Sequence, residues 1–284
     1  MNDFATLAAV PWLWWTLAGA VGLCVGSFLN VVVHRLPRML EQGWADQCAE
    51  LRDEAPPARV TYNLFTPRSG CPSCKQQLRA RDNVPVLSYL LLGGRCAHCG
   101  ARISARYPVI ELGAAALAVA AAWKFGAGYQ ALAIAGLLWV LLALSAIDID
   151  TQLLPDNLTL PLLWAGLIVN SFGLFVPLGD ALWGAVAGYL VLWVVYWAFK
   201  LLTGKEGMGY GDFKLLAALG AWLGWQMLPV IILLSSVVGA VVGIVLIVAR
   251  GRDRNIPIPF GPYLAGAGVL TVFFGKPLVA MYLG

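Results

Sequence analysis

The sequence predicts an α-helical, multi-span membrane protein of about eight transmembrane helices, with a small cytoplasmic zinc-binding domain between the first and second helices. Of the 284 residues, 60% are hydrophobic and 12% are charged, whereas a soluble domain carries about 25% charged residues. Long apolar runs recur along the chain, and one polar segment interrupts them early. That segment contains two Cys-x-x-Cys pairs, which predict the zinc site.

The apolar runs give the predicted helices in order. A membrane span needs about 20 apolar residues. The sixth run has only about 14, or about 21 Å of helix against a hydrocarbon core of about 30 Å. We therefore expect this span to start within the membrane, at Asp212. The eight runs are residues 11–33, 107–124, 130–148, 157–176, 181–200, 212–226, 227–249 and 259–281.

Basic residues predict the orientation of these spans. With eight spans, 17 of the 19 lysines and arginines lie on one side, which the positive-inside rule makes cytoplasmic. Only Lys124 and Lys276 fall on the other side, so both termini are expected outside. Only Asp3 and no basic residue precedes the first run, which argues against a cleaved signal peptide. The clusters are the segment from Arg35 to Arg106, then Lys200, Lys205 and Lys214, then Arg250, Arg252 and Arg254.

This topology divides the chain into three predicted parts. Residues 1–36 form the first transmembrane helix, residues 37–106 form the cytoplasmic four-cysteine domain, and residues 107–284 form the helical membrane core. The net charge of +4 follows from the topology, so we expect the lipid bilayer as a partner and no nucleic acid. The oligomeric state does not follow from the sequence.

The four cysteines of the insert predict a structural zinc site. They occur as CPSC at 71–74 and CAHC at 96–99, each beside turn-forming glycine or proline. Two such knuckles bring four thiolates to the corners of a tetrahedron, a closed site without an open catalytic position. Two disulfides or another metal are the alternatives, but cytoplasmic thiols stay reduced. The expected ligands are Cys71, Cys74, Cys96 and Cys99.

Two aspartates are the candidate catalytic pair. Asp212 lies at the start of the short sixth span, where a carboxylate costs about 2.5–3.5 kcal/mol to insert and needs a cavity and a partner. Asp148 ends the third span on the same membrane face, two residues deeper in the apolar run than the interfacial Asp150. Two carboxylates that share one proton can activate water and polarise a carbonyl, which is the chemistry of peptide-bond hydrolysis.

The residues around the aspartates suggest supporting roles, with simpler alternatives. Pro155 ends the third helix, and Asp156 then stands where an N-cap belongs. Gly209 and Gly211 permit close backbone approach, so that an extended substrate could lie beside Asp212. In the alternative interpretation, Asp212 is only the N-cap of its own helix.

Glu111, in the second span, lies near the cytoplasmic membrane face, where both aspartate clusters are also expected. We expect it to pair with a basic residue near the interface rather than to act in catalysis.

The chain resembles the type IV prepilin leader peptidases, also called prepilin peptidase/N-methyltransferases. In this family one aspartate lies seven residues before the proline of an LPD piece, here Asp148 before Pro155. The second belongs to a GxGD motif, here Asp212. The resemblance runs through most of the chain, in GSFLNVVVHRLP (26–37), YNLFTPRSGCPSC (62–74), GGRCAHCGARISARYPVIEL (93–112), DIDTQLLPDNLTLPLLW (148–164) and GMGYGDFKLLAALGAWLGW (207–225).

This resemblance implies an intramembrane aspartic endopeptidase of the bacterial inner membrane, with its zinc domain and active site on the cytoplasmic side. It implies cleavage of the basic leader from prepilins and pseudopilins of type IV pilus and type II secretion systems, typically between glycine and phenylalanine or another hydrophobic residue. It also implies methylation of the new N-terminal amine with S-adenosylmethionine.

The resemblance places the methyl transfer in the cysteine-bearing insert. The candidates are Gly94 and Arg95 beside the second knuckle, and Asn63, Pro67 and Arg68 before the first. Each also fits a structural role as a knuckle or packing residue, and no glycine-rich nucleotide loop follows a strand.

Three other functions fit part of the sequence. A proton-coupled transporter also buries aspartates in a helical bundle, although it needs no four-cysteine knuckles and no inverted repeat is evident. A non-enzymatic, zinc-anchored membrane scaffold would explain the cysteines and leave the aspartates unexplained. A peptidase without methyltransferase activity would need only the two aspartates.

Overall fold

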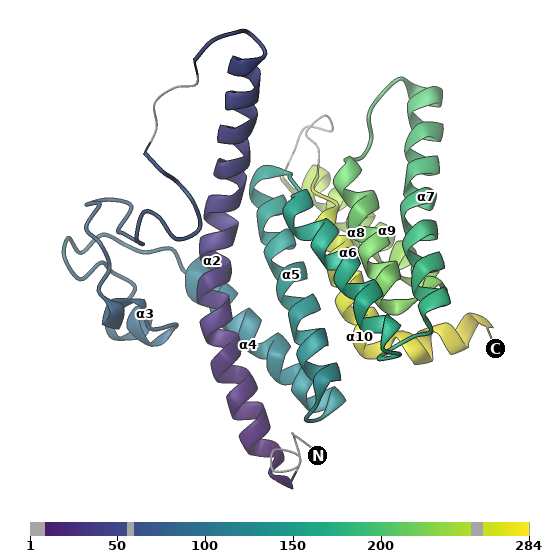
Figure 1. Cartoon of the computed structure of the whole chain (residues 1–284), viewed down its shortest axis with the longest axis horizontal. Coiled ribbons are helices and arrows are strands. Elements are labelled where there is room, and N and C mark those ends of the chain that lie inside the picture. Colours follow the sequence, from purple (N-terminus) through teal and green to yellow (C-terminus); the bar gives the residue numbers. More distant parts are fainter. Residues whose placement is uncertain (1–8, 56–59, 251–257, 284) are drawn as a thin grey trace. The chain divides into compact units, whose positions relative to one another are not determined.

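The computed structural model describes residues 9–55, 60–250 and 258–283. The basic residues Arg252 and Arg254 and the acidic Asp3 lie outside these ranges. Contacts divide the chain into two units, residues 1–143 and residues 144–284. The described elements (Figure 1) are α2 (Pro11–Glu50), η1 (Ala80–Asn83), α3 (Leu87–Leu91), α4 (Arg106–Phe125), α5 (Tyr129–Thr151), α6 (Asp156–Ser171), α7 (Leu178–Thr203), α8 (Tyr210–Leu223), η2 (Trp225–Met227), α9 (Leu228–Arg250) and α10 (Gly261–Leu283).

Each of the eight apolar runs forms a helix where it is described, so the multi-span helical class is confirmed. Within the described residues, five segments are long and apolar enough to cross a membrane: α2, α4, α5, α7 and Trp225–Val248. Helices α6 and α8 are shorter, at 16 and 14 residues, and the apolar part of α10 is Gly261–Gly275. The predicted short sixth segment is thus the helix α8.

Helix α2 is longer than the sequence predicts. It continues through the buried Pro37 to Glu50, a length of 40 residues, or about 60 Å. The expected boundary near residue 36 is therefore not a helix end. Good helix formers such as methionine, leucine, glutamate and alanine follow the proline, and they continue the helix after one lost hydrogen bond.

In the first unit, α2 and α4 pack closely through small residues. A Cβ atom on Gly22 would lie 2.6 Å from Cα of Ala115, and one on Gly26 would lie 2.6 Å from Cα of Glu111. The two backbones are therefore closer than any side chain on α2 would allow, which is the packing that small residues give membrane helices. Figure 1 shows the polar insert with α3 following α2 and leading into α4.

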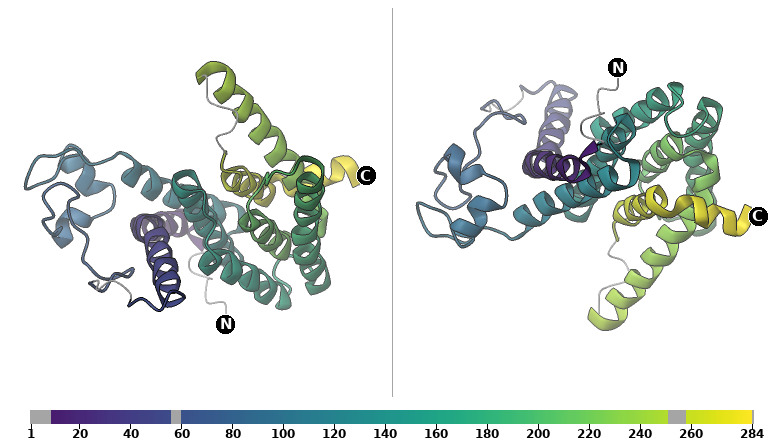
Figure 2. Two further views of the ribbon diagram at one scale, coloured as in Figure 1. Left: turned by 90° about the horizontal axis from the view of Figure 1, so that it is seen from above. Right: turned by 90° about the horizontal axis from the view of Figure 1, so that it is seen from below.

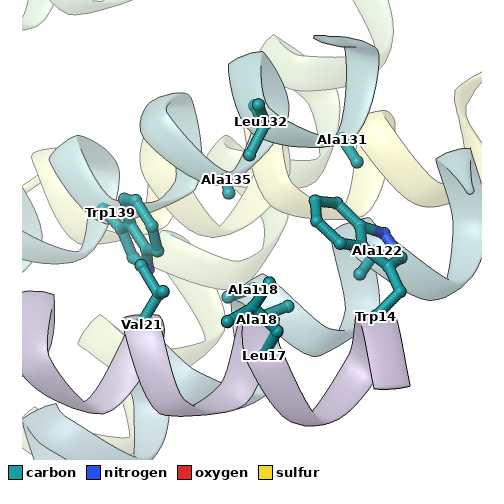
Figure 3. A pocket seen from close by; sticks show the side chains of 10 residues that line it. All are labelled: Trp14, Leu17, Ala18, Val21, Ala118, Ala122, Ala131, Leu132, Ala135 and Trp139. Atoms are coloured by element: carbon teal, nitrogen blue, oxygen red, sulfur yellow. The ribbon is translucent and has the colours of Figure 1, made fainter. Parts of the chain in front are cut away.

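An apolar cavity lies among α2, α4 and the beginning of α5 (Figure 3). Its volume is about 140 Å³, and Trp14 and Trp139 lie at its two ends. The indole N–H of Trp14 donates to the carbonyl of Gly126 at 3.0 Å, and that of Trp139 donates to the carbonyl of Ala114 at 2.9 Å. The cavity contains none of the predicted site residues and is not the candidate active site.

In the second unit, α8 is the buried helix. It packs against α6, α7 and α10, and almost every residue from Asp212 to Trp222 is buried. Gly184 of α7 meets Gly220 of α8 backbone to backbone. By contrast, α9 runs away from these helices toward its C-terminal end (Figure 2). The short helix that bears Asp212 is therefore held by its neighbours along nearly its whole length.

A buried asparagine donates hydrogen bonds to carbonyl groups at the C-terminal end of α8. The amide of Asn170 in α6 donates to the carbonyls of Ala221 at 2.8 Å and Trp222 at 3.2 Å. The indole of Trp222 donates in return to the carbonyl of Leu162 at 2.8 Å. Gly224, with φ of 83°, then ends the helix. These bonds supply partners for carbonyl groups that a helix end leaves unpaired.

Candidate functional site

Asp212 is a buried carboxylate in the first turn of α8. The N-cap position is Gly209, so Asp212 is the third residue of the helix and not its N-cap. The alternative interpretation of Asp212 as a cap is therefore wrong. The side chain is 6% exposed, and its Oδ1 atom is buried without a hydrogen-bond partner in the described part of the chain. A buried oxygen of this kind is costly unless water or a ligand reaches it.

Asp148 is the second buried carboxylate, in the last turn of α5. It is 4% exposed, and its Oδ2 atom accepts a hydrogen bond of 2.9 Å from the backbone N–H of Gly261. Gly261 is the first residue of α10, so the carboxylate lies at the positive end of a helix dipole. Asp150 is exposed, as predicted for a residue two positions further along a helix.

The two carboxylates lie near one another, because Leu154 contacts both Gly261, which lies against Asp148, and Gly211, which precedes Asp212. Both belong to the second unit, on the helices α5 and α8. A carboxylate pair that holds one proton offers a general base beside a general acid. The structure therefore brings together the two aspartates that the sequence selected.

Leu154 packs between two glycines, one near each aspartate. A Cβ atom on Gly211 would lie 2.6 Å from Cβ of Leu154, and one on Gly261 would lie 3.0 Å from its Cδ2. The space beside Gly211, where a substrate backbone was expected, is therefore occupied by the side chain of Leu154. Gly209 has no such contact, because the nearest atom to its Cβ position is Oδ2 of Asp212 at 3.7 Å.

Asp156 has a different position from the one predicted. Pro155, with an extended backbone at ψ of 131°, occupies the N-cap position, and Asp156 is the first residue of α6. The prediction that Asp156 is the N-cap is therefore wrong. Its carboxylate instead binds the ammonium group of Lys214, which lies 2.7 Å from both oxygens. This ion pair joins the beginning of α6 to the beginning of α8.

Aromatic side chains and a second ion pair hold the segment before α8. The ring of Tyr196 in α7 lies 5.2 Å from that of Tyr210 and 5.7 Å from that of Phe213. Lys200 donates to Glu206 at 2.7 Å, and this bond lowers the pKa of the Glu206 carboxyl. The segment that leads to Asp212 is therefore tied to α7.

Glu111 pairs with the backbone rather than with a basic residue, so that expectation is wrong. It is buried in α4 and accepts a hydrogen bond of 2.7 Å from the N–H of Val86. Val86 has φ of 58°, an unfavourable conformation for a β-branched residue. Val86 is the residue before α3, so the carboxylate holds the start of this short helix against α4.

The four predicted cysteines form one cluster. The Sγ atoms of Cys71, Cys74, Cys96 and Cys99 all lie within 4.8 Å of one another. Cys71 and Cys99 have their sulfurs 3.8 Å apart, which matches the edge of about 3.8 Å that follows from Zn–S bonds of about 2.3 Å in a tetrahedron. All six cysteines are free in the structure, and no disulfide joins the four of the cluster. The residues present therefore fit a tetrahedral zinc ion.

The two knuckles share one backbone pattern. Cys71 donates its N–H to the carbonyl of Gln76, and Cys96 does the same to Ala101, each at 2.9 Å. The residue after the second cysteine has a positive φ in both, 60° at Lys75 and 68° at Gly100. The same turn is thus built twice, and each turn presents two sulfurs to the centre.

The thiols of the cluster differ in acidity. Backbone N–H groups of Cys74 and Ser73 lower the pKa of Cys71 to about 6. For Cys99 the N–H of Ala101 also favours the thiolate, but burial and three neighbouring thiols raise the pKa to about 11. Without a metal the cluster therefore combines an acidic thiol with one that keeps its proton, and a cation would favour the thiolate form of all four.

The methyl-transfer candidates before the first knuckle belong to one loop. The side chain of Asn63 accepts from the N–H groups of Phe65 and Thr66 at 2.8 and 2.7 Å. The buried Arg35 of α2 donates to the carbonyls of Asn63 and Pro67 at 2.9 and 2.6 Å. Asn63 and Pro67 therefore shape and anchor this loop, as in their structural alternative. The side chain of Arg68 is exposed beside them.

The remaining candidates lie in the second knuckle. Gly94 has φ of 67°, and a Cβ atom there would lie 2.9 Å from the ring of Tyr89, so glycine is required by the fold. Arg95 is exposed and forms a β-bridge with Arg102. These contacts support the structural alternative for Gly94 and do not join it to the loop of Asn63.

Fold and site define a helical membrane protein with two buried aspartates and a cluster of four thiols that could hold a metal ion. Residues 20–125 match the bacterial peptidase A24 N-terminal domain, and residues 135–244 match the type IV leader peptidase family. The chain belongs to the type IV leader peptidase family.

Its relatives match along their full length. The prepilin leader peptidase/N-methyltransferase of Stutzerimonas stutzeri is 57% identical over 284 residues, which cover 100% of this chain and 98% of the relative. The protein of that name from Pseudomonas aeruginosa is 57% identical over 264 residues, covering 93% and 91%. That from Aeromonas hydrophila is 57% identical over 279 residues, covering 96% and 95%. No solved structure matches the chain. These matches do not support the transporter and scaffold alternatives.

Proposed function

We propose that this chain is a membrane aspartic endopeptidase that removes leader peptides from prepilins and pseudopilins and methylates the new N-terminal residue. The observation that carries the peptidase assignment is the buried, unpartnered Oδ1 of Asp212, on a helix whose Gly211 packs against Leu154 beside Asp148. The relatives named prepilin leader peptidase/N-methyltransferase support both activities.

In this mechanism the two aspartates divide the work of hydrolysis. One carboxylate accepts a proton from water as the water oxygen attacks the carbonyl carbon, and the other carboxyl group donates its proton to the carbonyl oxygen. The carboxyl group that took the proton from water then gives it to the amine nitrogen as the C–N bond breaks, and the other carboxylate takes back a proton from a hydroxyl group of the tetrahedral intermediate. Both carboxyl groups return to their starting state.

The proposal extends to the two cofactors and to the location. The four-cysteine cluster would hold a structural zinc ion that keeps the insert folded, and S-adenosylmethionine would supply the methyl group. The side chains of Arg68 and Arg95, which are exposed, remain the best candidates to contact this donor. We place the protein in the bacterial inner membrane, and the distribution of basic residues supports an insert on the cytoplasmic side.

Cleavage of a prepilin by detergent-purified protein tests the peptidase assignment. Asp148→Asn and Asp212→Asn should each reduce cleavage by at least about 100-fold, because a general acid or base contributes that much or more. Asp150→Asn is the matched control, since it makes the same change on the exposed side of α5 and should leave the rate near that of the parent protein.

Thermal unfolding in detergent must show that all three variants are folded. A folded Asp212→Asn protein that cleaves at the parent rate would contradict the proposed catalytic pair. Mass analysis of the product N-terminus, with and without S-adenosylmethionine, tests the second activity separately. An unmethylated product under both conditions would mean that the protein has peptidase activity without methyltransferase activity.

A further inference from the structure

We infer that Gly261, at the start of α10, is a positioning residue for the carboxylate of Asp148. This inference rests on the proposed peptidase function and adds a residue to its site. Gly261 lies 113 positions from Asp148 in the sequence, and its N–H donates to Oδ2 of that aspartate at 2.9 Å in a buried setting. The proposal is that glycine is required there because the carboxylate occupies the space of a side chain.

The contact leaves no room for a Cβ atom. An atom built on Gly261 would lie 2.7 Å from Oδ2 of Asp148 and 3.2 Å from its Cγ. Ordinary contacts between carbon and oxygen are longer than 3 Å. The N–H bond thus brings the carboxylate against the backbone at a distance that only glycine allows. The requirement is one of space, since Gly261 does not have a positive φ.

The group that must move is the catalytic carboxylate. Of the two neighbours of this Cβ position, the nearer is the end of the Asp148 side chain, and the other is Cδ2 of Leu154 at 3.0 Å. Both are ends of side chains rather than backbone, so they can rotate away without opening the helices. Gly261→Ala should therefore leave the fold intact and displace Asp148 from its place beside Asp212.

Such a displacement is costly for chemistry but not for binding. A shift of about 1 Å in a reacting group can reduce the rate about 100-fold. The substrate remains bound by its other contacts, so the loss should fall on kcat and leave KM nearly unchanged. A residue that only stabilised the fold would lower the yield or Tm of the protein instead.

The experiment compares prepilin cleavage by Gly261→Ala and Gly266→Ala in the purified full chain. Gly266 lies in the same helix and has no atom within 4 Å of its Cβ position, so its replacement adds the same methyl group without a clash. We expect kcat to fall about 100-fold in Gly261→Ala and KM to stay within about threefold of the control. Both variants should unfold within a few degrees of the parent protein.

Two outcomes would overturn the inference. One is a Gly261→Ala protein with the kcat of Gly266→Ala while Asp148→Asn is inactive. The other is a Gly261→Ala protein that does not fold. The inference requires that the side chains of Asp148 and Leu154 move aside while the backbone stays in place, so a misfolded protein would contradict it. If Asp148→Asn itself remains active, the proposed catalytic pair fails, which is a different result.

A double variant separates the two neighbours of Gly261. Leu154→Ala in the Gly261→Ala protein removes the contact with Cδ2 and leaves the one with Asp148. We expect kcat to remain low in this protein. Recovery to the kcat of Leu154→Ala alone would show that the methyl group acts through Leu154, and the inference would then be wrong.

Discussion

The ammonium group of Lys214 lies 2.7 Å from both carboxylate oxygens of Asp156, and this contact joins the first turns of α8 and α6. Lys214 follows Asp212 by two positions, and Asp156 follows Asp148 by eight. The ion pair therefore connects the segments that carry the two candidate catalytic residues. Both side chains are partly exposed, at 26% and 52%, which limits its contribution to stability.

A double-mutant cycle measures this pair. Asp156→Asn, Lys214→Met and the double variant should give a coupling energy of about 0.2–1 kcal/mol in thermal or denaturant unfolding, as for other exposed ion pairs. Cleavage should fall only several-fold, because the ion pair lies beside the candidate catalytic carboxylates and supplies neither of them. A coupling energy of zero would mean that the two groups do not interact in the folded protein.

The two glycines before Asp212 should respond differently to alanine. Gly211→Ala should lower the free energy of unfolding by about 1–3 kcal/mol, because its Cβ would meet Cβ of Leu154 at 2.6 Å and one backbone must move. Gly209→Ala should have a much smaller effect, since its nearest neighbour is 3.7 Å away. Equal destabilisation of both variants would show that backbone freedom, and not the contact with Leu154, is what the glycines provide.

Removal of the metal should unfold the insert and leave the membrane helices folded. We expect one zinc ion per chain by elemental analysis, and loss of it in Cys96→Ser. Cys48→Ser is the control, because Cys48 is exposed on α2 and outside the cluster. Chelator treatment should make the segment from Cys71 to Cys99 sensitive to protease. A full zinc content in Cys96→Ser would place the metal elsewhere.

Zinc uptake should release protons in proportion to the thiols that are still protonated. The pKa of Cys71 is lowered to about 6, so at pH 7.5 this residue is already mostly a thiolate. The pKa of Cys99 is raised to about 11, so this thiol keeps its proton at that pH and must lose it on binding, which predicts release of at least one proton per zinc. Affinity should therefore rise with pH. Calorimetry in buffers of different ionisation enthalpy measures this number, and a release near zero would mean that the cluster is preformed as thiolates.

Replacing Glu111 should loosen the segment around α3. Glu111→Leu leaves the N–H of Val86 without its acceptor, at a cost of about 1–3 kcal/mol for a buried donor. Hydrogen exchange should then become faster at residues 84–92 and stay unchanged in α8. Glu111→Gln retains an oxygen acceptor and should show a much smaller effect. Unchanged exchange in Glu111→Leu would show that the bond does not hold α3.

The sequence was sufficient for the parts of the site that depend on spacing along one segment. Asp148 and Asp212 could be selected because each ends or begins an apolar run, and the cysteines because two short knuckles recur. The helical runs followed from hydropathy alone. These features are local, and local patterns in the sequence record them directly.

The contacts between distant segments could not be predicted in this way. Nothing near Gly261 in the sequence indicates that its N–H binds Asp148, and only the fold brings Lys214 to Asp156. The end of α2 was misplaced because the helix continues past Pro37 into polar residues that are good helix formers. The N-cap of α6 was placed one residue too late, at Asp156 instead of Pro155, because proline can itself occupy this position. The partner of Glu111 is a backbone group, which no side-chain pattern reveals.

The backbone contact between Gly184 and Gly220 has a consequence for substrate access. Helix α8, which carries the candidate catalytic Asp212, is fixed to α7 at such close range and bonded to Asn170 at its far end, so we do not expect it to swing aside to admit a polypeptide. Helix α9, by contrast, diverges from the others and presents exposed valines together with Leu233 and Ile244. We therefore expect α7 and α8 to move as one rigid body during turnover, and the hydrophobic segment of the incoming pilin to be admitted where α9 parts from them.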